Sequence, residues 1–519
     1  MKRLLVTFAW LLSAAVLAPA AVLAPAVAAV EQATDLAADE VALPETIAVE
    51  AADLEAFELE ESKGWPNDPL YESSGSWQQD FADQWAVQSL ELYQDEDATE
   101  YQAVVVAVID TGIDYLHEDF ASDKLWHNPN EKRNGRDDDD NGFVDDLIGW
   151  NFVDANNNPW DQSGHGTHIA GIISACTHNG LGIAAINPAA RIMPLKVGNF
   201  VGQARSSAIA AAIHYAVDHG ARVINLSLGG AVVTTLEEEA LAYAAQQNVL
   251  VVTAAGNDGY RADAAGYAAI PSVLSVAASD VTGARAGFSS FGAEVDLIAP
   301  GVEVLSLRAR DSDFIALSGA PAYQPAAAVV REQYYRASGT SFAAAVVSGV
   351  ASRVLSARPG LSASQLKVVL LQSARDVEAP GVDQLSGFGL VDFNAALVSD
   401  PHKFIEARLS KIDLSLVDEQ VLLSLKGTAD ADRLAGFELQ VRAEQPDAMW
   451  LPLGSPMTTA IRNDRLAEVN LEKLIEQTGG ATEWRVRLLV NHEDGTTREA
   501  QMALALPRPA PPPEEQADE

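Results

Sequence analysis

The sequence predicts an α/β fold in which a doubly wound, mostly parallel sheet is followed by a small C-terminal β-sandwich. Two observations lead to this prediction. From residue 65 to about residue 400, runs of β-branched residues alternate with alanine-rich amphipathic stretches, which is typical of parallel strands crossed by helices. Beyond Pro401 the pattern changes to short alternating runs separated by turn signals, which favours antiparallel strands. The chain is therefore expected to contain two folded parts.

Four apolar runs in the first part are expected to be buried strands. They lie at residues 104–109, 191–197, 223–228 and 249–253. Between them, helices are expected at about residues 203–219, ended by Gly220, and at about residues 235–247. Another helix should follow Ser362, because Ser362 and Gln365 stand at the spacing of a capping box before an apolar run.

The ends of the chain are expected to lie outside the folded parts. Residues 1–29 combine a basic start, an apolar stretch and the small-residue pattern AVA at positions 26–28, which predicts a cleaved secretory signal peptide and hence a secreted protein. A membrane anchor is the competing interpretation, but two prolines interrupt the stretch. Residues 30–64 form an acidic leader or short pro-segment, and residues 507–519 a disordered tail. The two domains between them are then residues 65–400 and 401–506.

The composition excludes several classes of function. The chain has 34 basic and 73 acidic residues, and its net charge of −39 would repel nucleic acids and anionic membranes. This acidity indicates a heavily solvated surface, or carboxylates reserved for metal ions. No later segment is expected to be long and apolar enough to span a bilayer, and the protein is expected to be a monomer. Cys176 is the only cysteine, so stability cannot come from an intramolecular disulfide.

Two motifs provide a carboxylate and an imidazole. Asp110 directly follows the apolar strand at residues 104–109, at the sheet edge where α/β proteins bind ligands, although a lone Asp there could simply cap a turn. His165 lies in the sequence GHGTHIAGII, where flanking glycines allow close backbone approach and leave the imidazole accessible as a general base. His168, in the same motif, better fits a satisfied core residue.

Two further motifs provide a hydroxyl and an amide. Ser341 opens an alanine-rich helix in the sequence SGTSFAAAVVSG, where backbone N–H groups and the helix dipole would face a developing oxyanion. Taken alone, an ordinary N-cap serine would explain this position. Asn257 ends the apolar run VVTAAGN and could donate a hydrogen bond to the same oxyanion.

In their order along the chain, these motifs resemble those of the subtilisin-like serine proteases over about residues 66–397. The resemblance implies that Ser341 is the nucleophile, His165 the general base and then acid, and Asp110 the carboxylate that orients His165. It implies an oxyanion hole made by Asn257 and the Ser341 amide. The expected function is a secreted endopeptidase that cleaves proteins and peptides through an acyl-enzyme, with broad specificity. A catalytically inactive binding or adhesion protein with the same fold is the alternative.

The resemblance also implies a substrate site. The sequence NLSLGG at residues 225–230 is similar to the family's substrate strand, which pairs with an extended peptide, and it contributes Ser227, Leu228 and Gly229. Ala255 and Gly256, beside Asn257, are expected to contact the substrate too, although a buried strand would also suit these glycines. The chain departs from the family pattern at Ala345, where proline is usual, and in a leader that is short for a folded propeptide.

Calcium is the expected cofactor. The sequence NGRDDDDNGFVDD at residues 134–146 places Asp137, Asp139 and Asn141 at alternate positions before a glycine, with Asp146 available to complete the shell. It is an EF-like loop only, because Ile148 stands where an EF-hand has glutamate, and a solvated acidic loop is the alternative. By resemblance, Asp68 and Asp119 mark a second calcium site, which backbone groups near Asn179 would complete.

Overall fold

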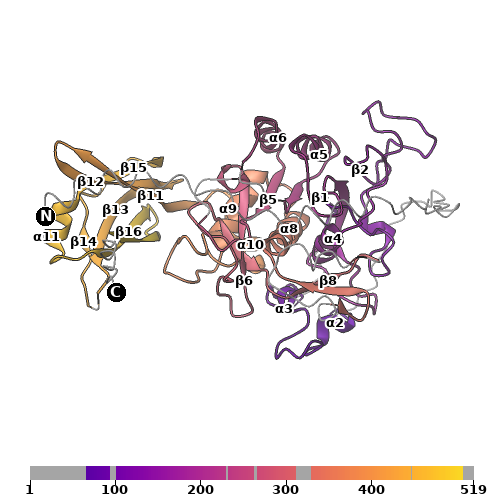
Figure 1. Cartoon of the computed structure of the whole chain (residues 1–519), viewed down its shortest axis with the longest axis horizontal. Helices are drawn as coiled ribbons and strands as arrows, with labels where there is room; N and C mark the ends of the chain where they lie inside the picture. The colour runs from indigo at the N-terminus through magenta and orange to yellow at the C-terminus, as the bar shows by residue number, and fades with distance from the viewer. Residues whose placement is uncertain are drawn as a thin grey trace, which may run out of the picture.

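The computed structural model describes residues 66–93, 101–228, 232–261, 266–310, 312, 329–445 and 447–506. The predicted signal peptide, acidic leader and C-terminal tail lie outside these residues, as does Gly229 of the predicted substrate site. The described chain forms two lobes, an α/β lobe and a lobe of antiparallel sheets (Figure 1).

A seven-stranded, fully parallel sheet forms the centre of the α/β lobe. Its order is β2-β3-β1-β4-β5-β6-β7. The strands are β1 (Val104–Asp110), β2 (Trp150–Asn151), β3 (Ala190–Lys196), β4 (Val223–Leu226), β5 (Leu250–Ala254), β6 (Val273–Ser279) and β7 (Leu297–Pro300). The predicted doubly wound parallel sheet is therefore confirmed, although β4 ends two residues before its expected end.

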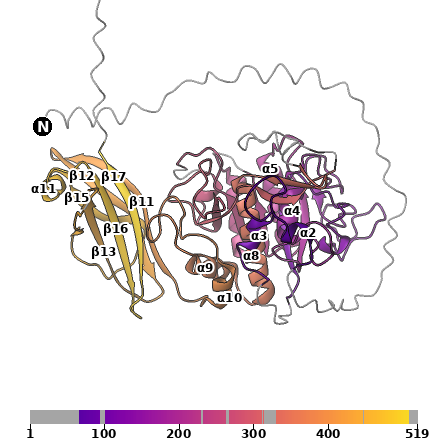
Figure 2. The same ribbon diagram turned by 90° about the horizontal axis from the view of Figure 1, so that it is seen from below.

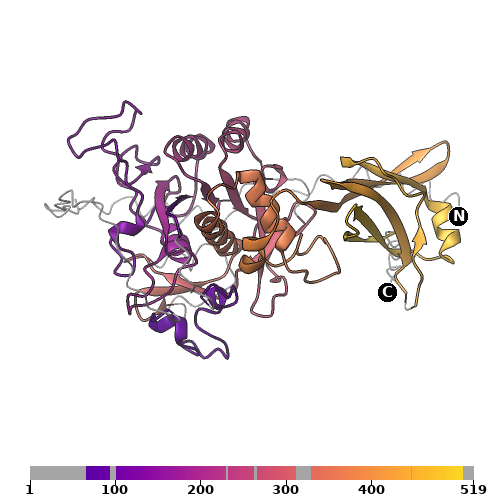
Figure 3. The same cartoon turned by 180° about the vertical axis from the view of Figure 1, so that it is seen from behind.

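Helices cover both faces of this sheet, as the alternation of β1 shows. Val106 and Val108 of β1 belong to the same hydrophobic cluster as α4 (His165–Ser174) and α8 (Thr340–Ala357). Ala107 and Ile109 belong to a second cluster with α5 (Ser206–Asp218) and α6 (Thr235–Gln246). Helix α8 also contacts α9 (Ala363–Ser373) and α10 (Phe393–Val398), and Figure 3 shows the orange helices of this region close together. Because both faces are buried, the strands consist mainly of apolar residues.

Helix α8 is the central helix of the lobe and contacts β1 and β3 to β7. Its 18 residues have a mean hydropathy of 1.3, so by length and composition it could cross a membrane. The expectation that no later segment has such a composition was therefore wrong. However, 94% of this window is buried inside the fold, which is what a core helix of a parallel sheet requires.

Short elements complete the α/β lobe. The helices are α2 (Pro69–Glu72) and α3 (Trp85–Gln88), with 3₁₀ turns η2 (Ser122–Lys124) and η3 (Tyr267–Ala269). A small antiparallel sheet of order β8-β10-β9 is formed by β8 (Val304–Leu307), β9 (Val329–Val330) and β10 (Tyr334–Ala337). Since β10 leads directly into α8, this sheet positions the start of that helix.

The C-terminal lobe contains two antiparallel sheets that pack on each other, as predicted (Figure 2). One has the order β11-β12-β15, with β11 (Ile405–Val417), β12 (Gln420–Ala431) and β15 (Ile461–Asn470). The other has the order β14-β13-β16-β17, with β13 (Leu434–Ala443), β14 (Leu451–Pro452), β16 (Glu483–His492) and β17 (Thr497–Ala505). Helix α11 (Leu471–Gln477) follows β15. The exact domain boundaries stay predictions.

Candidate active site

The candidate catalytic residues lie at the carboxyl edge of the parallel sheet. Asp110 is the last residue of β1, Ser227 directly follows β4, and Asn257 lies three residues beyond the end of β5. These strands are neighbours in the order β1-β4-β5, so their ends meet at one edge. Sequence separation is therefore no obstacle to a shared site.

Asp110 and His165 form a direct contact. Nδ1 of His165 donates to Oδ1 of Asp110 at 2.7 Å, and the carboxylate is fully buried. A Cβ atom at Gly166 would lie 2.1 Å from the Gly112 carbonyl oxygen, so only glycine lets α4 approach β1 this closely. Gly164, before the histidine, has a φ of +96°. Gly166 thus permits the close backbone approach that the sequence predicted.

The charge of Asp110 determines how His165 titrates. Burial by itself lowers the pKa of His165, but Asp110, through its charge and its hydrogen bond, raises that pKa, and the net pKa lies above the ordinary value. A carboxylate that is fully buried beside an imidazole stabilises the imidazolium form. The pair is therefore suited to accept a proton from a neighbouring hydroxyl.

Ser341 is the second residue of α8 and lies against Ser227. Its Oγ donates to the Ser227 carbonyl oxygen at 3.3 Å, and Oγ of Ser227 donates to the Ser341 carbonyl oxygen at 3.0 Å. The ring of the next residue, Phe342, lies 5.5 Å from the His165 ring, centroid to centroid. Within the described part of the chain, no hydrogen bond joins Ser341 to His165.

Asn257 is tied to the residue before Ser341. Its Oδ1 accepts from the backbone N–H of Thr340 at 2.8 Å and from the Thr340 hydroxyl at 3.0 Å. The Thr340 hydroxyl in turn accepts from the N–H of Gly256 at 3.1 Å, and Gly256 has a φ of +105°. These bonds fix the amide plane beside the start of α8, with Nδ2 as the group that can donate to a ligand.

His168 behaves as a structural residue, as its sequence context predicted. It is fully buried, its Nε2 donates to the Tyr335 carbonyl oxygen at 2.9 Å, and its ring packs on Phe342 at 4.5 Å. Burial lowers the pKa of His168 to about 3, so it stays neutral where His165 titrates. The two histidines of one motif are thus separated by environment.

Only the end of the predicted substrate strand has backbone groups that no neighbouring strand pairs with. Asn225 and Leu226 lie inside β4, which pairs with β1 on one side and β5 on the other. Backbone groups available to a peptide therefore begin beyond Leu226, at Ser227 and Leu228. Ala255 and Gly256 are half-buried next to Asn257.

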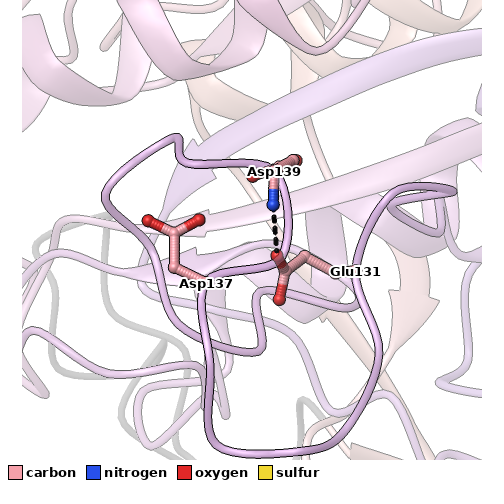
Figure 4. A group of neighbouring side chains, drawn as sticks. All are labelled: Glu131, Asp137 and Asp139. Atoms are coloured by element: carbon pink, nitrogen blue, oxygen red, sulfur yellow. Dashed lines mark hydrogen bonds between the residues drawn. The ribbon is translucent and has the colours of Figure 1, made fainter.

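The acidic loop before β2 gathers three carboxylates. One oxygen each of Glu131, Asp137 and Asp139 lies within 4.8 Å of the others (Figure 4). Asp137 and Asp139 were predicted, whereas Glu131 was missed because it precedes the alternating pattern. It is nearly buried, and its Oε1 accepts from the N–H of Asp138 at 2.5 Å and of Asp139 at 3.2 Å. Only the folded loop brings this side chain to the others.

The other two predicted ligands of the loop lie beside this cluster. Nδ2 of Asn141 donates to Oδ2 of Asp146 at 3.1 Å. Asp146 is fully buried and also accepts from Asn128 at 2.9 Å and from the Tyr215 hydroxyl of α5 at 2.5 Å. Burial raises the pKa of Asp146. In this arrangement Asp146 anchors the loop to α5.

Asp68 and Asp119, the predicted ligands of a second calcium site, both accept hydrogen bonds from Asn179, whose backbone N–H donates to Oδ1 of Asp68 at 3.3 Å. Oδ2 of Asp68 accepts from the N–H of His178 at 3.0 Å, and Nδ2 of Asn179 donates to Asp119 at 2.7 Å. Both carboxylates are fully buried. Burial raises the pKa of Asp119 to about 7 and raises that of Asp68. A cation is the species that would offset two buried carboxylates at one place.

Comparisons with known proteins give the family. The sequence model of the subtilase family matches residues 101–389, more than half of the chain. Thermitase of Thermoactinomyces vulgaris is 32% identical over 316 residues, which cover 61% of this chain and 94% of thermitase. The halolysin-like extracellular serine protease Nep of Natrialba magadii is 34% identical over 340 residues, 65% of this chain. The match covers 53% of Nep, so the chain spans about half of that relative.

The fold comparison agrees with the sequence comparison. A crystal structure of a lanthipeptide protease aligns with a TM-score of 0.51 and 26% identity, covering 64% of this chain and 98% of that chain. The chain therefore belongs to the subtilase family of serine peptidases.

Proposed function

We propose that the protein is a secreted serine endopeptidase that uses Asp110, His165 and Ser341 as a catalytic triad. The observation that carries the proposal is the 2.7 Å hydrogen bond from His165 to the buried Asp110, at the sheet edge where Ser341 begins α8. Such a pair lets the imidazole accept the serine proton while the carboxylate stabilises the imidazolium.

The reaction would proceed by acyl transfer. Ser341 exchanges its bond to the Ser227 carbonyl for one to Nε2 of His165, and its oxygen attacks the peptide carbonyl carbon while His165 takes the proton. His165 then gives this proton to the leaving amine. Water, activated by the same imidazole, hydrolyses the acyl-enzyme and restores the serine.

The oxyanion hole would consist of Nδ2 of Asn257 and the backbone N–H of Ser341. The backbone N–H and the hydroxyl of Thr340 both donate to the amide oxygen of Asn257, so the Nδ2 group does not need to reorganise when negative charge develops on the substrate oxygen. Losing one such donor costs a factor of about 10²–10³ in kcat. That factor was measured in another member of this family and does not come from the distances in this protein.

The substrates would be proteins and peptides bound in extended form. Backbone groups from Ser227 onward, together with Ala255 and Gly256, support recognition of the peptide main chain, which makes cleavage broad in sequence. The signal-like N-terminus and the name of the extracellular relative Nep both support export of the enzyme.

Calcium would stabilise the folded enzyme at the loop that contains Glu131, Asp137 and Asp139. Three carboxylates this close repel one another unless a cation lies between them, and oxygen-only donor sets suit calcium. When bound, the ion would supply charge compensation and structural rigidity, with no part in the chemical step. Asp68 and Asp119 are the residues that would hold a second ion.

Covalent labelling with an organophosphonate probe tests the proposed activity. We expect the wild-type protein to be labelled and Ser341→Ala to lose labelling completely, because the probe reacts only with an activated serine. Ser364→Ala, at an exposed serine of α9, is the matched control and should be labelled as fully as the wild type. A folded wild-type protein that never reacts would reject the enzyme and favour the inactive binding protein.

A further inference from the structure

One fully buried carboxylate outside the triad, that of Asp161, accepts five hydrogen bonds. Its Oδ1 accepts from the Thr111 hydroxyl, the Ser163 N–H and the Gly164 N–H, each at 2.9 Å. Its Oδ2 accepts from the Thr167 N–H at 3.0 Å and from the Thr167 hydroxyl at 2.7 Å. Three backbone N–H groups and two hydroxyl groups thus donate to this one carboxylate, which is more than an acidic residue that only caps a turn would accept.

The donors come from the two chain segments that carry the triad acid and base. Thr111 directly follows Asp110, and Gly164 directly precedes His165. The Thr111 hydroxyl also accepts from the N–H of Gly166 at 3.0 Å. Asp161 and Thr111 together thus connect the end of β1 to both residues that flank His165.

The charge of Asp161 also acts on the imidazole. The charged or titratable groups that face His165 are Asp110 from β1, Asp161 from the preceding loop and His168 from α4. Burial lowers the pKa of His165, Asp110 raises it most, and Asp161 raises it further. Nearby, the buried Lys196 of β3 donates to the Thr111 carbonyl oxygen at 2.5 Å, and burial lowers its pKa.

We propose that Asp161 is a positioning residue of the triad, which holds the His165 segment against Asp110 and favours the imidazolium form through its negative charge. The inference rests on the proposed function, because it assigns a role in that same reaction. It goes beyond the triad in naming a second buried carboxylate on which catalysis depends.

The competing explanation is a purely structural role. A carboxylate at the start of α4 stabilises the helix through its first N–H groups and its dipole, whatever the reaction. A structural role predicts lower stability and no change in how activity depends on pH. The pH profile of activity therefore separates the two explanations.

The decisive variant is Asp161→Asn. An asparagine keeps the size of the side chain but has one oxygen, so its NH₂ group must face donors on one side, and the negative charge is lost. We expect kcat to fall by about 10²-fold with little change in KM, as for a misplaced catalytic group. We also expect the pKa of the acidic limb of kcat/KM to fall by about half a unit or more, because imidazolium loses a nearby anion.

Asp383→Asn is the matched control. Asp383 is a nearly buried loop carboxylate that accepts from the backbone N–H groups of Leu385 and Ser386 and from the Ser386 hydroxyl. It lines a pocket together with Arg408 of the C-terminal lobe, and none of the triad residues lines that pocket. This variant should lose stability yet keep the wild-type kcat and pH profile.

Thr111→Val gives a second measurement if Asp161→Asn fails to fold. It removes the hydroxyl that joins Asp161 to Gly166 but keeps the charge, so kcat should fall while the acidic limb stays in place. An unchanged kcat in folded Thr111→Val, or an unshifted acidic limb in folded Asp161→Asn, would overturn the inference. Labelling of wild-type Ser341 by the phosphonate in the same experiment separates this failure from failure of the proposed function.

Discussion

A chain of hydrogen bonds runs beneath Ser341. The hydroxyl of Ser348, two turns further along α8, donates to Oδ1 of Asn225 at 2.9 Å. Nδ2 of Asn225 donates to the Ser227 hydroxyl at 2.8 Å, and this hydroxyl donates to the Ser341 carbonyl oxygen at 3.0 Å. All four residues are buried. Because each of these buried groups hydrogen-bonds to the next, the network holds the start of α8 against β4.

At the residue scale we expect Ser348→Ala to destabilise the protein. The change leaves Oδ1 of the buried Asn225 without its donor, which costs about 1–3 kcal/mol in the free energy of unfolding. Urea denaturation measures this cost. Ser364→Ala, on the exposed side of α9, should change the same quantity by less than about 0.5 kcal/mol. Equal midpoints for the two variants would contradict the prediction.

At the element scale, the acidic loop is folded largely by its own carboxylates. Oε2 of Glu131 accepts from the N–H of Asp145 at 3.0 Å, in addition to the two N–H groups on its Oε1. Asp145 accepts from the N–H of Asn134 at 2.8 Å, and Asp137 from that of Gly142 at 2.7 Å. The backbone of the loop thus depends on negative charges that also repel one another.

Calcium should therefore stabilise the protein, and Glu131→Gln should weaken the effect. A ligand that binds only the native state raises the free energy of unfolding by about 2.7 kcal/mol at 100 times its Kd. We expect the wild-type melting temperature to rise with calcium and to fall in chelator, with a smaller response in the variant. Asp123→Asn, at an exposed carboxylate of η2, should respond as the wild type does. Melting temperatures independent of calcium would contradict the proposed site.

At the scale of the whole molecule, the C-terminal lobe is joined to the α/β lobe through a buried ion cluster. Asp296 forms ion pairs with Arg408 of β11 at 2.8 Å and with Lys367 of α9 at 3.0 Å. The guanidinium groups of Arg408 and Arg498 lie 5.6 and 5.0 Å from the ring of Phe388. Because these contacts bury charge at the junction, we expect the two lobes to unfold together.

Arg408→Ala should thus destabilise the α/β lobe as well as the C-terminal lobe. Removing Arg408 leaves Lys367 as the remaining cation beside the buried Asp296, so the cost in the free energy of unfolding should be up to about 3 kcal/mol. Lys411→Ala, which removes the exposed ion pair with Asp413 on the same strand, should cost less than about 1 kcal/mol. Calorimetry would show one shifted transition for Arg408→Ala. Two separate transitions in the wild type would contradict joint unfolding.

The same cluster predicts how stability depends on pH. Burial alone would raise the pKa of Asp296, but Lys367 and Arg408 outweigh it, and the folded pKa lies below the ordinary value. Its contribution is therefore present above the unfolded pKa of about 3.9 and is lost as the pH falls through the lower folded pKa. Urea denaturation from pH 7 to pH 3 should show this loss. Asp296→Asn should show a shallower decline at acid pH, and parallel curves would contradict the assignment.

The C-terminal sheet also gains a partner from the α/β lobe. Val382 pairs with β17, which is the edge strand of the sheet β14-β13-β16-β17. The Val382 N–H donates to the Glu499 carbonyl oxygen at 2.7 Å, and the Gln501 N–H donates to the Val382 carbonyl oxygen at 3.1 Å. The segment thus covers a strand edge that could otherwise pair with another chain. Removing residues 405–506 would expose Asp296 and Phe388 on the α/β lobe.

Much of the fold followed from local patterns. The capping box of Ser362 and Gln365 forms as expected at the start of α9, and the apolar runs became the parallel strands. These features are readable because propensity, capping and periodicity act over a few residues. The end of β4 was harder to predict, because Ser227 and Leu228 continue the sequence pattern of the strand, whereas its pairing with β1 stops at Asn225 and its pairing with β5 at Leu226.

The local motifs named the candidate triad only through their joint resemblance, in order along the chain, to those of the subtilisin-like proteases, because each motif taken alone also has an ordinary structural explanation. Only the tertiary structure revealed the partners that lie far away in sequence or that depend on burial: Glu131 in the acidic loop, Asp161 between the triad segments, and Asp296 between the lobes. The sequence does not show whether an acidic side chain is solvated or buried in the folded protein. Its pKa and its role depend on which donors and cations the folded chain brings to it.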